Sequence, residues 1–198
     1  MSGQPGWNSS LREQFTWHWE HLLRERLSGL TDDEYFWEPV PGAWSVRPRG
    51  TGTAPVQAGA GAMTIDFAFP EPEPAPFTTI AWRLGHVIVG VLALRNAGHF
   101  GREPVDYSTF EYAATADEAL AQLEQELRAW LSGVEALGEE GLAERCGEAE
   151  GPFADDPMSR LVLHIHRELI HHLSEVCVLR DLYLHAEGGE QRSGGPLP

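Results

Sequence analysis

Lysine is absent from this sequence, and basic residues of any kind are scarce. All 14 basic residues are arginines, and 30 aspartates and glutamates oppose them, which gives a formal net charge of −16 at pH 7. A field of that sign repels the phosphates of nucleic acids and of anionic lipid surfaces. We therefore expect neither nucleic acid nor a membrane among the partners of this protein.

Cysteine and long apolar runs are also in short supply. The two cysteines, Cys146 and Cys177, form no Cys-x-x-Cys pair, so the sequence supports neither a disulfide framework nor a cysteine-based zinc site. No stretch approaches the roughly 18 uninterrupted apolar residues of a membrane span, and the first residues lack the basic and apolar regions of a signal peptide. The sequence predicts a soluble, cytoplasmic protein.

The chain does contain many apolar residues at helical spacing. Four stretches repeat such residues every three or four positions. Two of them begin with capping boxes, at Ser10 and Thr115, and one begins with Pro157 after a capping Asp156. The predicted helices cover residues 11–27, 79–97, 115–137 and 156–184. They predict an all-α fold, a four-helix bundle whose first crossover is long and irregular.

The connections between these helices differ in character. Residues 47–62 are rich in glycine and proline, which makes them a poor helix or strand. Residues 63–69 alternate apolar and polar side chains and are compatible with a short strand or hairpin arm. We expect three parts: a flexible N-terminus (1–9), a single domain (10–186, with an irregular insertion at about 46–77) and a disordered tail (187–198).

Two predicted helices carry polar residues on the stripe that faces the interior of a bundle. His172 lies on the apolar seam of the last helix, and Glu168 lies one turn before it, so their side chains can converge. In the second helix, His86 is the polar member of an otherwise apolar row. Two imidazoles and a carboxylate form a ligand set that suits Zn²⁺ and leaves a fourth position open for water or substrate.

An ordinary structural interpretation competes with this metal site. A single interior histidine is more often a hydrogen-bonded core residue than a ligand, and Glu168 with His172 can be a simple i,i+4 pair. The last helix also contains His164, His166 and His171, so the choice of ligand is open. His164, Glu168 and His172 share a face, but three ligands on one straight helix span about 12 Å, too far for one ion.

Three stretches carry a family resemblance: residues 30–37 with 42–45, the run IAWRLGH at 80–86, and the run from 168 to 183 that begins ELIHHLSE. They resemble the DinB-like superfamily, metal-binding four-helix bundles that include bacterial thiol transferases. The family commonly uses one histidine on its second helix and a His-x-x-x-His pair on its last. His86 and His172 match, and Glu168 replaces the remaining histidine, as in the branch resembling mycothiol-dependent maleylpyruvate isomerase.

The resemblance implies further properties of the fold and the site. It implies an up-down-down-up order of the helices and a homodimer. His86, Glu168 and His172 would hold one divalent ion, for which Zn²⁺ is preferred and Ni²⁺ is the alternative. The implied activity is transfer of a low-molecular-weight thiol, such as mycothiol, to a small electrophilic substrate, because a metal with an open position presents a bound thiol as thiolate.

The sequence leaves more than one interpretation for the residues around the metal and for the reaction. His18, Trp82 and His171 are candidates for the pocket, although ordinary core packing explains the aromatic side chains as well. Two other functions stay open: a non-catalytic metal-binding dimeric module or small-molecule binder, and a metal-dependent hydrolase. The hydrolase would use Glu175 as general base, which lies two turns beyond Glu168.

Overall fold

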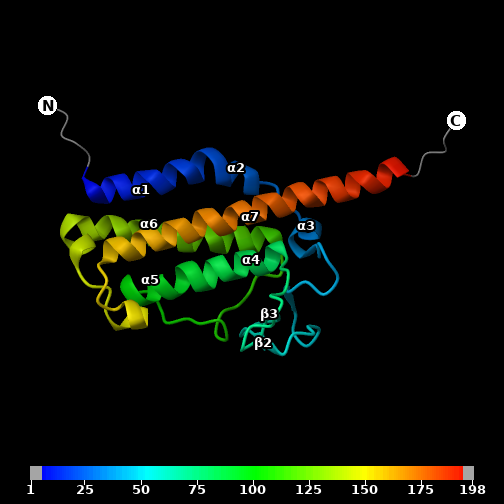
Figure 1. The fold of residues 1–198 in the computed structure, drawn as a ribbon, viewed down its shortest axis with the longest axis horizontal. Coiled ribbons are helices and arrows are strands. Elements are labelled where there is room, and N and C mark those ends of the chain that lie inside the picture. The colour runs from blue at the N-terminus through cyan, green and yellow to red at the C-terminus, as the bar shows by residue number, and fades with distance from the viewer. Residues whose placement is uncertain (1–5, 194–198) are drawn as a thin grey trace.

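The computed structural model describes residues 6–193, with their side chains up to residue 186. Four helical segments lie side by side along the long axis of the molecule (Figure 1). They are α1 (Trp7–His18), extended by the π-helical η1 (Trp19–Leu23) and α2 (Arg24–Leu27); α4 (Ile80–His86), extended by the π-helical η2 (Val87–Ala93) and α5 (Leu94–His99); α6 (Ala116–Ala143); and α7 (Met158–Ser193).

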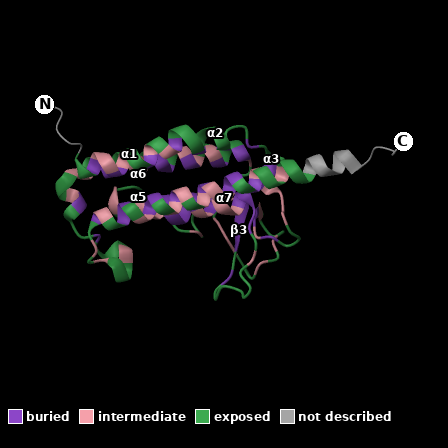
Figure 2. Ribbon diagram, turned by 45° about the horizontal axis from the view of Figure 1, so that its top comes forward, coloured by how far each residue is buried: buried purple, intermediate pink, exposed green. Residues whose placement is uncertain are grey.

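Apolar side chains from all four segments form one core. In Figure 1, α1 and α7 run in one direction and α4, α5 and α6 run in the other. Each long helix turns a buried face toward its neighbours and an exposed face outward (Figure 2). Phe15, Leu84, Trp130 and Leu169 represent the four segments in this core, and each is fully buried. Burial of one such side chain stabilises the fold by about 1.5–3 kcal/mol.

The predicted starts of the second and third helices are confirmed. The Thr79 hydroxyl accepts a hydrogen bond from the backbone N–H of Trp82, and the Thr115 hydroxyl accepts one from the N–H of Glu118. Both side chains therefore satisfy a backbone donor that the first helical turn leaves open. These caps set the position of α4, which carries His86.

The first helix begins earlier than predicted. The proposed cap at Ser10 is wrong, because α1 begins at Trp7 after Gly6. The Ser10 hydroxyl instead donates to the carbonyl oxygen of Gly6 within the first turn. The last helix begins at Met158, one residue after Pro157, and continues to Ser193, beyond its predicted end at residue 184.

The glycine-rich insertion contains a small antiparallel sheet. Its strands are β1 (Val46–Pro48), β2 (Val56–Ala58) and β3 (Met63–Phe67), in the order β1-β3-β2. The strand predicted within 63–69 is thus confirmed, but the prediction that 47–62 is unsuited to a strand is wrong. Pairing with β3, as in Ala58 opposite Ile65, supplies the order that local composition does not reveal.

Two short helices join this arrangement, and the ends of the chain are only partly described. The short helices are α3 (Asp32–Phe36) and the 3₁₀ segment η3 (Glu148–Phe153). Residues 7–9, expected to be flexible, belong to α1, and 187–193, expected to be disordered, belong to α7. The rest of those two expectations falls on residues 1–5 and 194–198, outside the described residues. Within the described part of the chain, none of the helices combines the length and apolarity needed to cross a membrane.

His166 occupies the core rather than a metal site. Its ring stacks on Phe15 at 5.0 Å and meets the edge of Trp130, and its Nε2 atom has no hydrogen-bond partner among the described residues. Burial lowers the pKa of His166 to about 4, against a weaker opposing hydrogen bond to the backbone of Leu11. The core therefore holds a neutral imidazole that resists protonation.

This histidine predicts an acid-dependent loss of stability. Between pH 6.5 and about 4 the unfolded chain takes up a proton at His166 that the native state does not take up. The free energy of unfolding therefore decreases as the pH is lowered through this range. We expect His166→Leu to reduce the loss of unfolding free energy between pH 7 and 4.5 by about 2 kcal/mol. Urea unfolding at both pH values measures this loss, and the control variant is His21→Leu, because the His21 ring is exposed. Equal losses in both variants would contradict the assignment.

Candidate functional site

His86 lies at the end of α4, where the helix widens into the π-helical η2. Such wide turns are often found at functional sites. The ring stacks on Trp82 of the preceding turn, with centroids 5.5 Å apart and planes 14° apart. Its Nδ1 atom lies 2.8 Å from the hydroxyl oxygen of Tyr107. The imidazole is therefore held from two sides.

The His172 ring faces His86 across the interface between α4 and α7. The two ring centroids are 4.9 Å apart, with the planes nearly perpendicular. Nδ1 of His172 lies 2.8 Å from Oε2 of Glu175, and a carboxylate can only accept, so Nδ1 carries the proton. Arg83 of α4 donates to the same Glu175 oxygen at 2.6 Å. This arrangement leaves the Nε2 atom of His172 as the nitrogen that can bind a cation.

The carboxylate of Glu168 lies next to the Nε2 atom of His172. Its Oε2 atom lies 3.5 Å from Nε2 of His172. Two lone pairs facing each other need a cation between them, either a proton or a metal ion. Ligands at about 2.0–2.2 Å from a tetrahedral ion lie roughly 3.4 Å apart, so the observed spacing fits two ligands of one metal. An anchored Nδ1–H is also the usual arrangement of a metal-binding histidine.

The electrostatics of these groups suit ligands for a cation. Burial lowers the pKa of His86 to about 4, and the neighbouring His172 and Arg83 act in the same direction. Burial alone would raise the pKa of Glu168, but Arg167, His164 and His172 outweigh it and lower the pKa. At neutral pH the site therefore offers a neutral imidazole and a carboxylate, which are the forms that bind metals.

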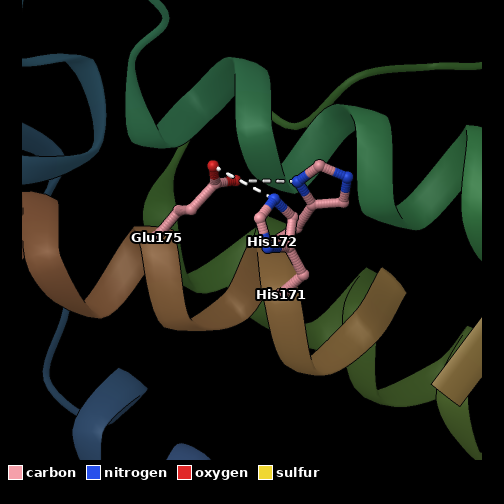
Figure 3. A group of neighbouring side chains, drawn as sticks. All are labelled: His171, His172 and Glu175. Atoms are coloured by element: carbon pink, nitrogen blue, oxygen red, sulfur yellow. Dashed lines mark hydrogen bonds and ion pairs between the residues drawn. The ribbon is translucent and has the colours of Figure 1, made fainter. Parts of the chain in front are cut away.

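A second group of ligand atoms overlaps this one. His171, His172 and Glu175 each offer an atom within 4.8 Å of the others, and they are the one such group of three among the described residues (Figure 3). The ligand atoms of the predicted set, His86, Glu168 and His172, do not all lie within 4.8 Å of one another. However, the His171 side chain is 63% exposed, and Glu175 already accepts from Arg83 and His172. We therefore favour the predicted set, which leaves Glu175 as an outer partner.

A cavity of about 290 Å³ opens beside the predicted ligands. His86 and Glu168 line it, together with Tyr107, Arg95 and His164. Gly90 also belongs to its wall, and a Cβ at that position would lie 2.0 Å from the Tyr107 hydroxyl oxygen. The absence of a side chain at Gly90 is thus what allows Tyr107 to reach His86. A small molecule in the cavity would therefore contact His86 and Glu168, two of the three predicted ligands.

The predicted pocket residues lie in three different places. Trp82 stacks on His86, as described. His171 lines a groove on the outer side of α7, together with Phe77 and Val178. His18 is half-buried on α1 and lines none of the cavities described here. Of these three residues, Trp82 therefore contacts the predicted ligand His86, and the ring of His171 meets that of the predicted ligand His172 at 5.0 Å between centroids.

The sequence interpretation missed one residue and misjudged another. Tyr107 lies in the irregular segment between α5 and α6, where no periodicity marks it, so its contact with His86 had no signal in the sequence. Glu175 was assigned only as a base for hydrolysis, although its position three residues after His172 permits the observed hydrogen bond. Both residues orient imidazoles.

Comparison with known families identifies the family of this chain. The family model of the DinB superfamily matches residues 54–176, which is more than half of the chain and includes His86, Glu168 and His172. The chain therefore belongs to the DinB superfamily, whose members generally bind a metal ion. No curated protein and no solved structure matches the chain.

Proposed function

We propose that this protein binds one divalent metal ion through His86, Glu168 and His172 and transfers a low-molecular-weight thiol to a small electrophile. The observation that supports this proposal is the 3.5 Å approach of Glu168 Oε2 to His172 Nε2, while Nδ1 of His172 is fixed by Glu175. Zn²⁺ is the proposed ion and Ni²⁺ the alternative. We also infer a cytoplasmic homodimer with the up-down-down-up topology of the superfamily.

The ion would lower the pKa of a bound thiol so that thiolate is available at neutral pH. The residues of the chain then have separate tasks. Tyr107 and Glu175 hold the two imidazoles so that each Nε2 atom faces the ligand position. Arg83 neutralises Glu175, which keeps a second negative charge from the site. In the reaction, the sulfur would form a bond to the electrophilic carbon while a π bond of the electrophile breaks, and the atom that receives this electron pair would take up a proton that replaces the one released by the thiol.

The hydrolase alternative is weakened by the position of Glu175. A general base must accept a proton from water, but both Arg83 and His172 already donate to the Oε2 atom of this carboxylate. The non-catalytic metal-binding module uses the same ligands and differs in activity alone. The experiment below therefore separates enzyme from binder.

The test measures conjugates between thiols and electrophiles. The purified protein is stripped of metal, reloaded with Zn²⁺ or Ni²⁺, and incubated with mycothiol, bacillithiol or glutathione and a panel of electrophiles. We expect metal-dependent formation of a conjugate, detected by mass spectrometry, with at least one thiol. Metal binding without turnover of any thiol would overturn the transferase and support the binding module. Ester cleavage without thiol would instead support the hydrolase.

A further inference from the structure

A second cavity, of about 410 Å³, shares His86 and Tyr107 with the cavity beside Glu168. Its volume lies within the roughly 300–1,000 Å³ of typical small-molecule pockets. The sheet of the insertion forms part of its wall through Ile65 and Phe67, and α4 contributes Trp82. The insertion and the predicted metal ligands therefore meet in one place.

Aromatic rings form a closed circuit around this cavity. From His86 the circuit passes to Trp82 at 5.5 Å, to Trp44 at 6.3 Å, to Phe67 at 6.5 Å and to Tyr107 at 6.4 Å between centroids. The hydrogen bond between Tyr107 and Nδ1 of His86 closes it. Phe67 and Tyr107 are nearly parallel, with planes 23° apart, and the two pairs that contain Trp44 are tilted by about 40°. All five side chains line the cavity, so part of each ring is available to a guest.

Two of the rings are also held in place by hydrogen bonds that involve the backbone. Trp82 Nε1 donates to the carbonyl oxygen of Asp66 at 2.8 Å, which ties α4 to β3. The backbone of Trp44 pairs on both sides of Thr78, donating to Phe77 and accepting from Thr79. Aromatic rings that are anchored in this way and still line an open cavity indicate a preformed binding site and not incomplete packing.

The charge of the lining argues for an uncharged guest. No arginine lines the cavity, so a carboxylate or phosphate would find no partner. The Asp66 carboxylate is engaged by Arg47 and the backbone N–H of Ser45 and is 3% exposed. Glu71 lies in an exposed stretch of the lining. Both contacts are made by Oδ2 of Asp66, whereas Oδ1 is buried and has no hydrogen-bond partner among the described residues. The interior therefore offers π faces and no exposed carboxylate to pair with a cation.

We propose that this cavity binds an uncharged planar group, an aryl ring or a conjugated system of similar size, on the small molecule that this protein handles. The assignment of that molecule as the electrophile rests on the proposed function. Its planar end would stack within the aromatic circuit, while its reactive end would reach past His86 and Tyr107 toward the ligand position. The aromatic circuit would thereby select aryl-substituted substrates over short aliphatic ones.

Binding of an uncharged fluorescent arylamine tests this proposal without metal or thiol. N-phenyl-1-naphthylamine is titrated against the full chain in the presence of a chelator. We expect saturable binding that Phe67→Ala weakens about tenfold, since an aromatic contact contributes about 0.5–1.5 kcal/mol. The matched control is Phe77→Ala. Phe77 is 45% exposed, against 40% for Phe67, and it lies in the outer groove on α7.

Several results would overturn the proposal. They are the absence of saturable binding, equal weakening by Phe67→Ala and Phe77→Ala, and displacement of the probe by benzyltrimethylammonium or naphthoate as effectively as by naphthalene. Phe67→Leu, which keeps apolar bulk without a π face, is a second variant should Phe67→Ala not fold. Probe binding by a protein that takes up no Zn²⁺ or Ni²⁺ when these ions are added separately would leave this inference intact and remove only the proposed function.

Discussion

Replacing His86 or His172 by alanine is expected to weaken Zn²⁺ binding by more than about 100-fold, because outer partners alone are typically worth about 10–100-fold. His171→Ala is expected to leave the affinity nearly unchanged. The difference follows from the geometry, since His172 faces both His86 and Glu168 whereas the His171 side chain is 63% exposed. Titration calorimetry and elemental analysis at pH 7 provide the measurement, with circular dichroism to verify folding.

Two further variants make this experiment decisive. Glu175→Gln keeps the shape of the side chain but removes the carboxylate that accepts from His172, so we expect the smaller loss of an outer partner. The parent protein should contain about one ion per chain. Loss of binding in His171→Ala as large as in His86→Ala would place the ion on His171, His172 and Glu175 instead.

Arg180→Met is expected to lower the free energy of unfolding by about 3–5 kcal/mol, the usual cost of leaving one partner of a buried ion pair alone. The Arg180 side chain on α7 is 14% exposed and lies 2.9 Å from Oε1 of Glu34, which is 5% exposed. It also donates to the carbonyl oxygens of Arg26 and Ser28 after the first helix. Its removal therefore leaves the buried Glu34 carboxylate with Thr31 as its remaining hydrogen-bond partner and removes two contacts to backbone carbonyl oxygens.

The matched control is Arg160→Met, on the same helix. Arg160 pairs with Asp156 at 3.0 Å, but its side chain is 70% exposed, and exposed pairs contribute about 0–1 kcal/mol. Chemical unfolding at pH 7 compares the two variants.

The pKa of Glu34 agrees with this ion pair. Burial alone would raise the pKa of Glu34, yet Arg180 and Thr31 outweigh it and lower the pKa. A similar small loss in both variants would mean that solvent screens Glu34 more than its burial indicates.

Helix positions were predictable where a local signal coincided with the packing. Thr79 and Thr115 cap the helices that their sequence patterns predicted, because a side-chain acceptor at the first turn acts over three residues. The same signal at Ser10 was misleading, since Asn8 bonds to the backbone carbonyls of Val134 and Gly138 and extends the helix toward α6. The sheet depends on partners distant in sequence, which a local pattern does not contain.

In the site, too, the residues predicted from the sequence are those that lie at helical spacing. Helical spacing predicts that Glu168 and His172 share a face, and the apolar row around His86 predicts that it turns inward. The structure adds Tyr107 from an irregular segment, and it brings Phe67, on the strand predicted within 63–69, to the wall of the cavity beside His86. Alternation predicts the strand but not its neighbours, because the position of the sheet depends on tertiary contacts.

The stacking of Trp82 on His86 has a spectroscopic consequence. An indole 5.5 Å from an imidazole ligand is an intrinsic fluorophore at the coordination sphere. Zinc has a filled d shell and leaves such an excited state largely undisturbed, whereas a paramagnetic ion at the same position shortens its lifetime. The chain contains seven tryptophans, so the emission of Trp82 would be isolated by comparison with Trp82→Phe, and it would tell whether the proposed ion is paramagnetic without any added dye or label.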